Sequence, residues 1–311
     1  MRNEIINKHL KRDKISGDEN FPEAVLIDST SFCNLRCSMC VHFKMQRKKG
    51  IMPWEIYTKI IDEIANTNPK TKVWLIFFGD PFILARIKPS IFDRIAYAKS
   101  RGLLNLAVNS NGNLMDKAAA EKLIESGLDA IYFGIDAFTA PTYDKLRVGG
   151  DYNKVVSNIL YLIELKKKLK ANKPEVIVQF VEMEENKHEK EDFIKFWSAQ
   201  GITVKVRPMV SWAGKIKAPN LKSDDIPRRP CHWIMKTMSI IDSGQVVFCA
   251  VDLDAEVIVG DVKNNSLQEI WNGKLKQMRN FHLRREFDKL PQLCQRCQDW
   301  QSSGVDFYSQ K

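Results

Sequence analysis

The sequence has 311 residues, of which 44% are hydrophobic and 28% are charged, and its net charge is +10. This length fits one barrel-sized domain with a smaller appendage, and the composition is that of a globular protein with a core. No apolar run approaches the roughly 20 residues that cross a bilayer. The polar start of the chain, residues 1–20, excludes a secretory signal, so we expect a cytoplasmic protein with no membrane partner.

The cysteines and the excess of positive charge bear on the possible partners. There are 7 cysteines, in one group of three and one of four, and an odd count in a reducing compartment suits metal ligation better than disulfides. The basic clusters, as in Lys166–Lys168 and Arg228–Arg229, have no interleaved aromatic residues of an RNA-binding motif. We expect a solvated basic face and no nucleic-acid partner.

The first predicted strand, residues 25–28, leads directly into three cysteines with CxxxCxxC spacing, Cys33, Cys37 and Cys40. A four-iron cluster normally takes one cysteine per iron, so three cysteines leave one iron open for a substrate or cosubstrate. The alternative is a structural zinc site completed by a distant ligand such as His42. Zinc favours paired CxxC or His spacings, whereas this triplet is asymmetric, and the pattern therefore favours an iron–sulfur cluster.

Strand and helix signals then alternate up to about residue 210. A helix begins after Pro53, and its apolar residues recur at helical spacing. Alternation of this kind predicts an all-parallel α/β sheet with functional residues at the carboxyl ends of the strands, in either a doubly wound sheet or a barrel. The other predicted strands are residues 73–78, 104–108, 130–135, 176–181 and 203–206.

Polar residues stand where several of these strands end. A carboxylate after the fourth strand can accept hydrogen bonds from ribose hydroxyls, and a planar guanidinium suits bidentate capture of a carboxylate. Gln179 and Arg207, on the fifth and sixth strands, are candidates for catalysis in the cavity, with a core amide and a surface ion pair as the alternatives. The residues at the ends of the second to fourth strands are Gly79, Asp80, Pro81, Asn109, Ser110 and Asp136, followed by Arg147.

The remaining cysteines follow a polar, proline-bearing linker, residues 215–230. A predicted hairpin joins residues 238–241 to 246–248, and a helix is expected around 267–279. A zinc ribbon is the alternative to an iron–sulfur site for these four cysteines. They are Cys231, Cys249, Cys294 and Cys297.

The cysteine triplet after a first strand resembles the radical S-adenosylmethionine (SAM) superfamily. The resemblance implies a partial (β/α)6 TIM-like barrel, open on one side, whose three cysteines bind a 4Fe–4S cluster. In that family the open iron binds SAM, which is cleaved to methionine and a 5′-deoxyadenosyl radical that abstracts hydrogen from the substrate. A flavodoxin or ferredoxin-type protein is the implied electron donor. Met39 replaces the usual aromatic residue near the adenine.

The same resemblance assigns SAM contacts to the strand ends. Gly79-Asp80-Pro81 resembles the family's GGEP-type segment, whose backbone receives the SAM amino group. Asn109 and Ser110 belong to a turn that resembles the family's polar TNG turn, which helps to hold SAM. Arg147 ends a segment similar to the family's ETYxKIR and is expected at the SAM carboxylate, and Asp136 at the ribose.

The C-terminal cysteines resemble the short, Twitch-like version of the SPASM extension and imply a second, auxiliary 4Fe–4S cluster in a small β-hairpin and helix domain. We therefore expect four parts, namely an N-terminal extension (1–20), the barrel (21–214), the linker (215–230) and the auxiliary cluster domain (231–311).

Relatives of this architecture remodel sugars and aminocyclitols or modify ribosomal peptides. Peptide modifiers often carry a separate recognition domain, for which the residues before the barrel are too few. We therefore expect oxidation of a small polyhydroxylated or amino-sugar substrate, with the auxiliary cluster in electron transfer. The alternatives are a sugar epimerase, a peptide or protein maturase and, more remotely, a zinc-stabilised nucleic-acid-binding protein.

Overall fold

The computed structural model describes residues 20–221, 226–302 and 306–308. The predicted N-terminal extension, apart from Asn20, and residues 222–225 of the predicted linker lie outside the described residues. Strands and helices alternate up to residue 208, as expected from the sequence. In chain order they are β1 (Ala24–Ile27), α2 (Trp54–Thr67), β2 (Lys72–Trp74), α3 (Ile91–Ser100), β3 (Leu106–Ser110), α4 (Lys117–Glu125), β4 (Ala130–Gly134), α5 (Ala140–Leu146), α6 (Tyr152–Lys168), β5 (Glu175–Glu182), α7 (Lys190–Ala199) and β6 (Thr203–Pro208).

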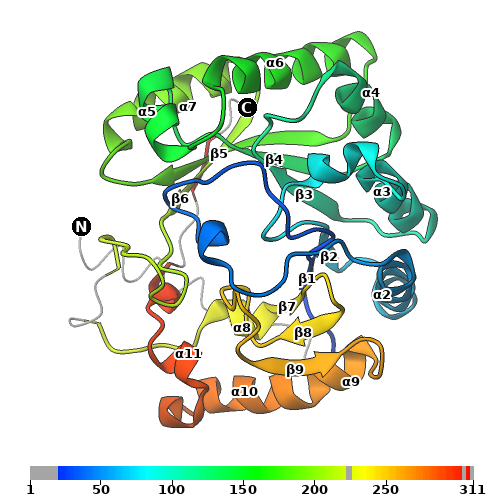
Figure 1. Ribbon diagram of the computed structural model, residues 1–311, viewed down its shortest axis with the longest axis vertical. Helices are drawn as coiled ribbons and strands as arrows, with labels where there is room; N and C mark the ends of the chain where they lie inside the picture. Colours follow the sequence, from blue (N-terminus) through cyan, green and yellow to red (C-terminus); the bar gives the residue numbers. More distant parts are fainter. Residues whose placement is uncertain (1–19, 222–225, 303–305, 309–311) are drawn as a thin grey trace.

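These six strands are parallel and lie in chain order in one curved sheet, with the helices on its outer side (Figure 1). β1 and β6 do not pair with each other, because β1 has β7 as its second neighbour and β6 has β10. The barrel is therefore open, and the predicted partial (β/α)6 barrel is confirmed.

Apolar side chains on both faces of the strands explain the buried parallel sheet. Successive side chains point to opposite faces, so Ile131 and Phe133 of β4 reach the main core beneath the helices, whereas Tyr132 between them does not. Tyr132 instead joins a small separate cluster on the inner face, with Ala107 and Ile177. The barrel thus has an outer core and an inner surface of different composition.

Two predicted elements differ from those observed. The predicted strand 73–78 pairs only as Lys72–Trp74, because Phe77 and Phe78 leave the sheet and pack against Trp212, with ring centroids 6.4 and 6.0 Å away. The single helix expected at 267–279 is two helices, since the chain turns at Gly273. A Cβ atom at Gly273 would lie 2.8 Å from the carbonyl oxygen of Glu269, so this turn requires glycine.

The C-terminal region continues the same sheet. β7 pairs in parallel with β1 and antiparallel with β8, which confirms the predicted hairpin, and β10 pairs antiparallel with β6 at the opposite edge. No helix in the described part of the chain is long and apolar enough to cross a membrane. The elements are α8 (His232–Lys236), β7 (Thr237–Ile240), β8 (Gln245–Val247), β9 (Ile258–Asp261), α9 (Leu267–Asn272), α10 (Lys274–Leu283), α11 (Gln292–Gln295) and β10 (Asp306–Tyr308).

Candidate active site and cluster ligands

The loop with the first three cysteines follows β1 and is fixed to the far side of the barrel. The backbone amides of Arg36 and Ser38 donate to the carbonyl oxygens of Val148 and Leu146, each over 2.9 Å. These two acceptors lie at the end of α5, on either side of Arg147. The loop therefore meets the predicted SAM-binding arginine through backbone hydrogen bonds.

The three thiols of this loop lie in an apolar shell. Burial raises the pKa of Cys33 to about 12 and that of Cys40 to about 11, and it also raises the pKa of Cys37. Thiols of this kind ionise only when a strong cationic partner such as iron takes the place of the proton. The shell consists of Leu35, Met39, Leu146, Val181 and Met183.

His42, the candidate fourth ligand of a zinc site in this loop, is already engaged. Its Nε2 donates to the carbonyl oxygen of Ser31 over 2.7 Å.

Arg147 and Asp136 lie together at the end of β4. The carboxylate of Asp136 accepts hydrogen bonds from Nη2 of Arg147 and, over 2.7 Å, from the amide of Val181. Nη1 of Arg147 lies 3.7 Å from the sulfur of Cys37. Burial would lower the pKa of Arg147, but the charges of Asp136 and Cys37 raise it, so the guanidinium stays a cation. Its Nε is buried and has no hydrogen-bond partner among the described residues, which leaves a donor for a ligand.

A glycine that the sequence did not single out makes room for this arginine. A Cβ atom at Gly134 would lie 2.2 Å from Nη2 of Arg147. Only glycine therefore allows the guanidinium to lie over the end of β4. The signal in the sequence is its place at the end of a buried strand, two residues before Asp136.

Asp80 holds the ends of two strands together. Its carboxylate accepts from the hydroxyl of Ser110 (2.9 Å), the amide of Asn111 (2.8 Å) and the amide of Phe82 (3.0 Å). Gly79 is required beside it, because a Cβ atom there would lie 2.1 Å from the carbonyl oxygen of Thr30. Pro81 begins a short 3-10 helix, Pro81–Arg86. The side chain of Asp80 is thus used for scaffolding, and the expected contact of this segment with SAM through its backbone stays a prediction.

Asn109 and Gln179 meet inside the barrel. Nε2 of Gln179 donates to Oδ1 of Asn109 over 3.1 Å, and this contact joins β5 to β3. One residue from Ser110, Asn111 donates to Asn34 over 2.9 Å and lies 3.9 Å from the sulfur of Cys33. Asn111 thus links the predicted SAM turn to the cysteine loop.

Met39 and Arg207 complete the predicted set. Met39 is buried in the cysteine loop, and its carbonyl oxygen accepts from the indole of Trp212 over 3.0 Å. Arg207 follows Val204 and Val206, which pack in the outer core, so its side chain belongs to the inner face of β6. Within the described residues Arg207 forms no ion pair, unlike the surface pair considered from the sequence.

The four C-terminal cysteines, which are far apart in sequence, surround one recess. Cys231, Cys249, Cys294 and Cys297 line it, and its exposed lining is apolar. Burial raises the pKa of all four thiols, to about 12 for Cys231. Four thiols around a single recess can ligate all four irons of a cluster and leave none open.

Two side chains of this recess were not predicted. Nη2 of Arg228 lies 3.3 Å from the sulfur of Cys294 and donates to the Cys294 carbonyl oxygen over 2.7 Å. His282 is fully buried, and its Nε2 lies 3.5 Å from the same sulfur. Donors near sulfur stabilise a reduced cluster. Arg228 appeared in the sequence only as part of a basic pair, because nothing local marks its contact with a cysteine so distant in the chain.

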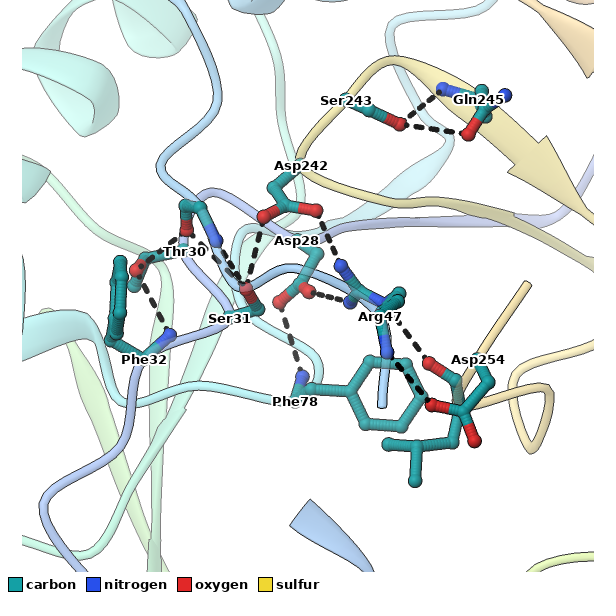
Figure 2. A network of polar contacts seen from close by, with 12 residues as sticks. Asp28, Thr30, Ser31, Phe32, Arg47, Phe78, Asp242, Ser243, Gln245 and Asp254 are labelled. Carbon is teal, nitrogen blue, oxygen red and sulfur yellow. Dashed lines mark hydrogen bonds and ion pairs between the residues drawn. The ribbon is translucent and has the colours of Figure 1, made fainter. Parts of the chain in front are cut away.

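The cysteine loop is joined to the C-terminal region by an arginine whose side chain is 10% exposed (Figure 2). Nη2 of Arg47 lies 2.9 Å from Asp28, and its Nη1 lies 2.5 Å from Asp242 of the β7–β8 turn. Ser31 donates to the second oxygen of Asp242 over 2.9 Å, and Nε of Arg47 donates to the carbonyl oxygen of Leu253, also over 2.9 Å. One side chain thereby connects β1, the loop and the C-terminal region.

Comparison with known families agrees with this geometry. Residues 27–196, more than half of the sequence, match the radical SAM superfamily. The chain belongs to this superfamily. Residues 231–298 match the SPASM iron–sulfur cluster-binding domain. Membership in these families implies that the protein uses SAM and 4Fe–4S clusters, and the two sets of cysteines and the free donor of Arg147 fit these groups.

Two curated relatives are similar to part of the chain. The tungsten-containing aldehyde ferredoxin oxidoreductase cofactor-modifying protein of Pyrococcus furiosus is 30% identical over 165 residues, which are 51% of this chain and 44% of the relative. The GTP 3',8-cyclase of Alkaliphilus metalliredigens is 30% identical over 142 residues, 45% of this chain and 42% of the relative. The matched part therefore spans less than half the length of these relatives.

Solved structures share the fold over most of the chain. BtrN in complex with AdoMet and 2-DOIA aligns with a TM-score of 0.62 at 14% identity, covering 89% of this chain and 93% of BtrN. Streptococcus suis SuiB bound to S-adenosylmethionine aligns with a TM-score of 0.67 at 14% identity, covering 90% of this chain and 72% of SuiB. At this identity the likeness establishes the fold alone.

Proposed function

We propose that this radical SAM enzyme oxidises a small polyhydroxylated or amino-sugar substrate, as a dehydrogenase. The observation that carries the proposal is the recess lined by Cys231, Cys249, Cys294 and Cys297. With a thiolate for every iron, the auxiliary cluster has no open site for substrate and is suited to electron transfer. An electron acceptor beside a radical enzyme favours net oxidation over a redox-neutral rearrangement.

We assign the roles at the barrel end as follows. Cys33, Cys37 and Cys40 hold the cluster that binds SAM, in a loop whose amides are fixed to the end of α5. Arg147 is oriented by Asp136, and its unpaired Nε is offered to the SAM carboxylate. Asp136 then serves as the orienting anion of Arg147, and its contact with the ribose stays a prediction from the sequence.

The two clusters and SAM would supply the redox chemistry, and the protein side chains would position the substrate. When bound, the first cluster and SAM supply a 5′-deoxyadenosyl radical, and the second cluster supplies a one-electron acceptor. The substrate carbon would give a hydrogen atom to this radical and one electron to the second cluster, and its hydroxyl or amino group would give a proton to water. A C=O or C=N bond would then form, and the product would be lighter by two hydrogens. The contact between Gln179 and Asn109 places polar groups on the inner face of the barrel, where a substrate would be oriented.

The test is anaerobic turnover of the reconstituted enzyme with candidate polyols and amino sugars. Substrate-dependent release of 5′-deoxyadenosine and a product two mass units lighter are the expected results. The variant in which Cys33, Cys37 and Cys40 are all changed to Ala should lose SAM cleavage but keep the iron bound by the other four cysteines. A product that is an isomer of unchanged mass would show that the enzyme is an epimerase. Turnover of a ribosomal peptide, with no turnover of polyols or amino sugars, would show that it is a peptide maturase.

A second variant tests the auxiliary cluster separately. Cys294→Ala/Cys297→Ala should still cleave SAM when dithionite is supplied, yet form no oxidised product. Electron paramagnetic resonance should show one cluster signal instead of two. If the oxidised product formed at an unchanged rate, the auxiliary cluster would be structural and the argument for a dehydrogenase would fail.

A further inference from the structure

The inner face of the barrel carries three cationic side chains, Lys72 of β2 and Lys205 and Arg207 of β6, here called the lumen cations. Their direction follows from strand alternation, since Val204 and Val206 pack in the outer core and the residues between and after them point the other way. Val73 likewise packs in the outer core next to Lys72.

Two of the lumen cations lie over an aromatic surface. Trp74 and Tyr132 pack against each other with ring centroids 4.8 Å apart. Nζ of Lys72 lies 4.5 Å from the centroid of Trp74 and 5.4 Å from that of Tyr132, and Nζ of Lys205 lies 5.1 Å from that of Tyr132. Cations at this distance are attracted to the ring faces. The rings thus hold both ammonium groups inside the barrel.

Carboxylates do not balance these charges. Within the described residues none of the lumen cations forms an ion pair. Burial lowers the pKa of Lys72 and of Arg207, and the more distant charges of Glu175 and Asp136 oppose this shift without reversing it. No carboxylate is among the influences on Lys205, whose pKa is lowered to about 7 by burial and by the positive charges of Arg207 and Lys72. Burying an ammonium group without an anion is costly, so an anion bound beside Lys205 would favour its charged form.

We propose that the lumen cations bind a carboxylate or phosphate group of the substrate. The inference rests on the proposed function and sharpens its substrate class. Among polyhydroxylated substrates it selects sugar acids and sugar phosphates, and it disfavours a free amino sugar, whose ammonium group would be repelled by like charge. Trp74 and Tyr132 provide the flat apolar surface on which the carbon skeleton rests.

The reactivity of Lys205 gives a test that does not depend on turnover. The holoenzyme with SAM bound is treated with trace acetic anhydride at pH 8, and acetylation of each lysine is measured by mass spectrometry with gluconate, glucose 6-phosphate or glucose present. At about ten times its dissociation constant, an anion that occupies the site should slow acetylation of Lys205 about tenfold by mass action. Exposed Lys154 is the internal control and should be unaffected.

Gluconate protection without protection by glucose 6-phosphate assigns a carboxylate, and the reverse assigns a phosphate. Equal protection by glucose, or none by either anion, overturns the proposal. In Lys72→Met the protection should weaken, whereas Lys154→Met, which removes the same charge from the surface, should leave it unchanged. Equal protection in the two variants would show that Lys72 takes no part.

Two further measurements separate this inference from its competitors. Lys205→Arg keeps the cation but cannot act as a base, so retained product formation supports anion binding, and loss of turnover with gluconate binding intact would make Lys205 a base instead. Release of 5′-deoxyadenosine with dithionite and no substrate reports on the radical SAM activity alone. If SAM is cleaved but neither anion protects Lys205, the proposed anion site is wrong and the proposed oxidation is unaffected. If an anion protects Lys205 but no substrate is oxidised, the anion site is supported and the proposed oxidation is wrong.

Discussion

Replacing Arg47 by Met tests how the cysteine loop is joined to the C-terminal region. The variant leaves Asp28 and Asp242 without their cation, and their side chains are only 1% and 6% exposed. Removing one partner of a buried ion pair costs about 3–5 kcal/mol, because the other charge stays desolvated. The lost hydrogen bond from Nε to the carbonyl of Leu253 adds about 1 kcal/mol. We therefore expect the free energy of unfolding to fall by about 4–6 kcal/mol at pH 8.5.

The same variant has a pH dependence whose sign is fixed by Asp28. Burial raises its pKa to about 7, from an ordinary value of 3.8, and Arg47 opposes this rise. The stability that protonated Asp28 contributes is fully present below its unfolded pKa and is lost as the pH rises through the folded value. Without Arg47 the pKa of Asp28 in the folded protein rises further, so at pH 6 its carboxyl group is neutral and needs no cation. The loss in free energy of unfolding caused by Arg47→Met should therefore be smaller at pH 6 than at pH 8.5.

Urea unfolding of the reconstituted protein at both pH values measures this effect. Arg86→Met is the matched control, since Arg86 pairs with Asp116 at the surface with 88% of its side chain exposed, and such pairs contribute under about 1 kcal/mol. A deficit for Arg47→Met no larger than that of the control, or one that grows as the pH falls, would refute the reasoning.

Three further predictions concern single contacts. Gly134→Ala places a methyl group against Arg147, so the dissociation constant for SAM, measured by equilibrium dialysis, should rise; an unchanged value would remove Arg147 from the SAM site. Trp212→Phe loses the hydrogen bond to the carbonyl of Met39 and should cost about 1 kcal/mol in urea unfolding, which a variant of native stability would contradict. Ser266→Ala removes the capping box of α9 and should also cost about 1 kcal/mol, and an unaltered urea midpoint would count against that role of the cap.

The sequence was informative wherever the chemistry is local. Apolar runs such as 176–181 are dictated by burial on both faces, and the spacing of Cys33, Cys37 and Cys40 brings three thiols into one short loop whatever surrounds it. The end of β2 was misplaced because local hydrophobicity cannot distinguish a strand from residues such as Phe78, which leave the sheet for a distant tryptophan.

The residues that sequence reasoning missed act over long range. Arg47 pairs with Asp242, which lies 195 residues further along the chain, and it carries no motif. In the sequence, Lys205 is an ordinary polar residue of a strand. Only the curved sheet shows that its side chain lies inside the barrel. Which charged side chains meet inside a barrel depends on the order of the strands and on the register between them. The composition of the sequence does not contain this information.

The pairing of the outermost barrel strands has a consequence for how the chain assembles. A parallel strand with a free edge is a template for pairing with other molecules. In the part of the chain that the structure describes, the second neighbours of β1 and β6 are β7 and β10, which lie beyond residue 236. The barrel strands are synthesised before the C-terminal region, so both edges of the barrel sheet are unpaired at that stage. Until β7 and β10 pair with them, these edges can pair with other molecules.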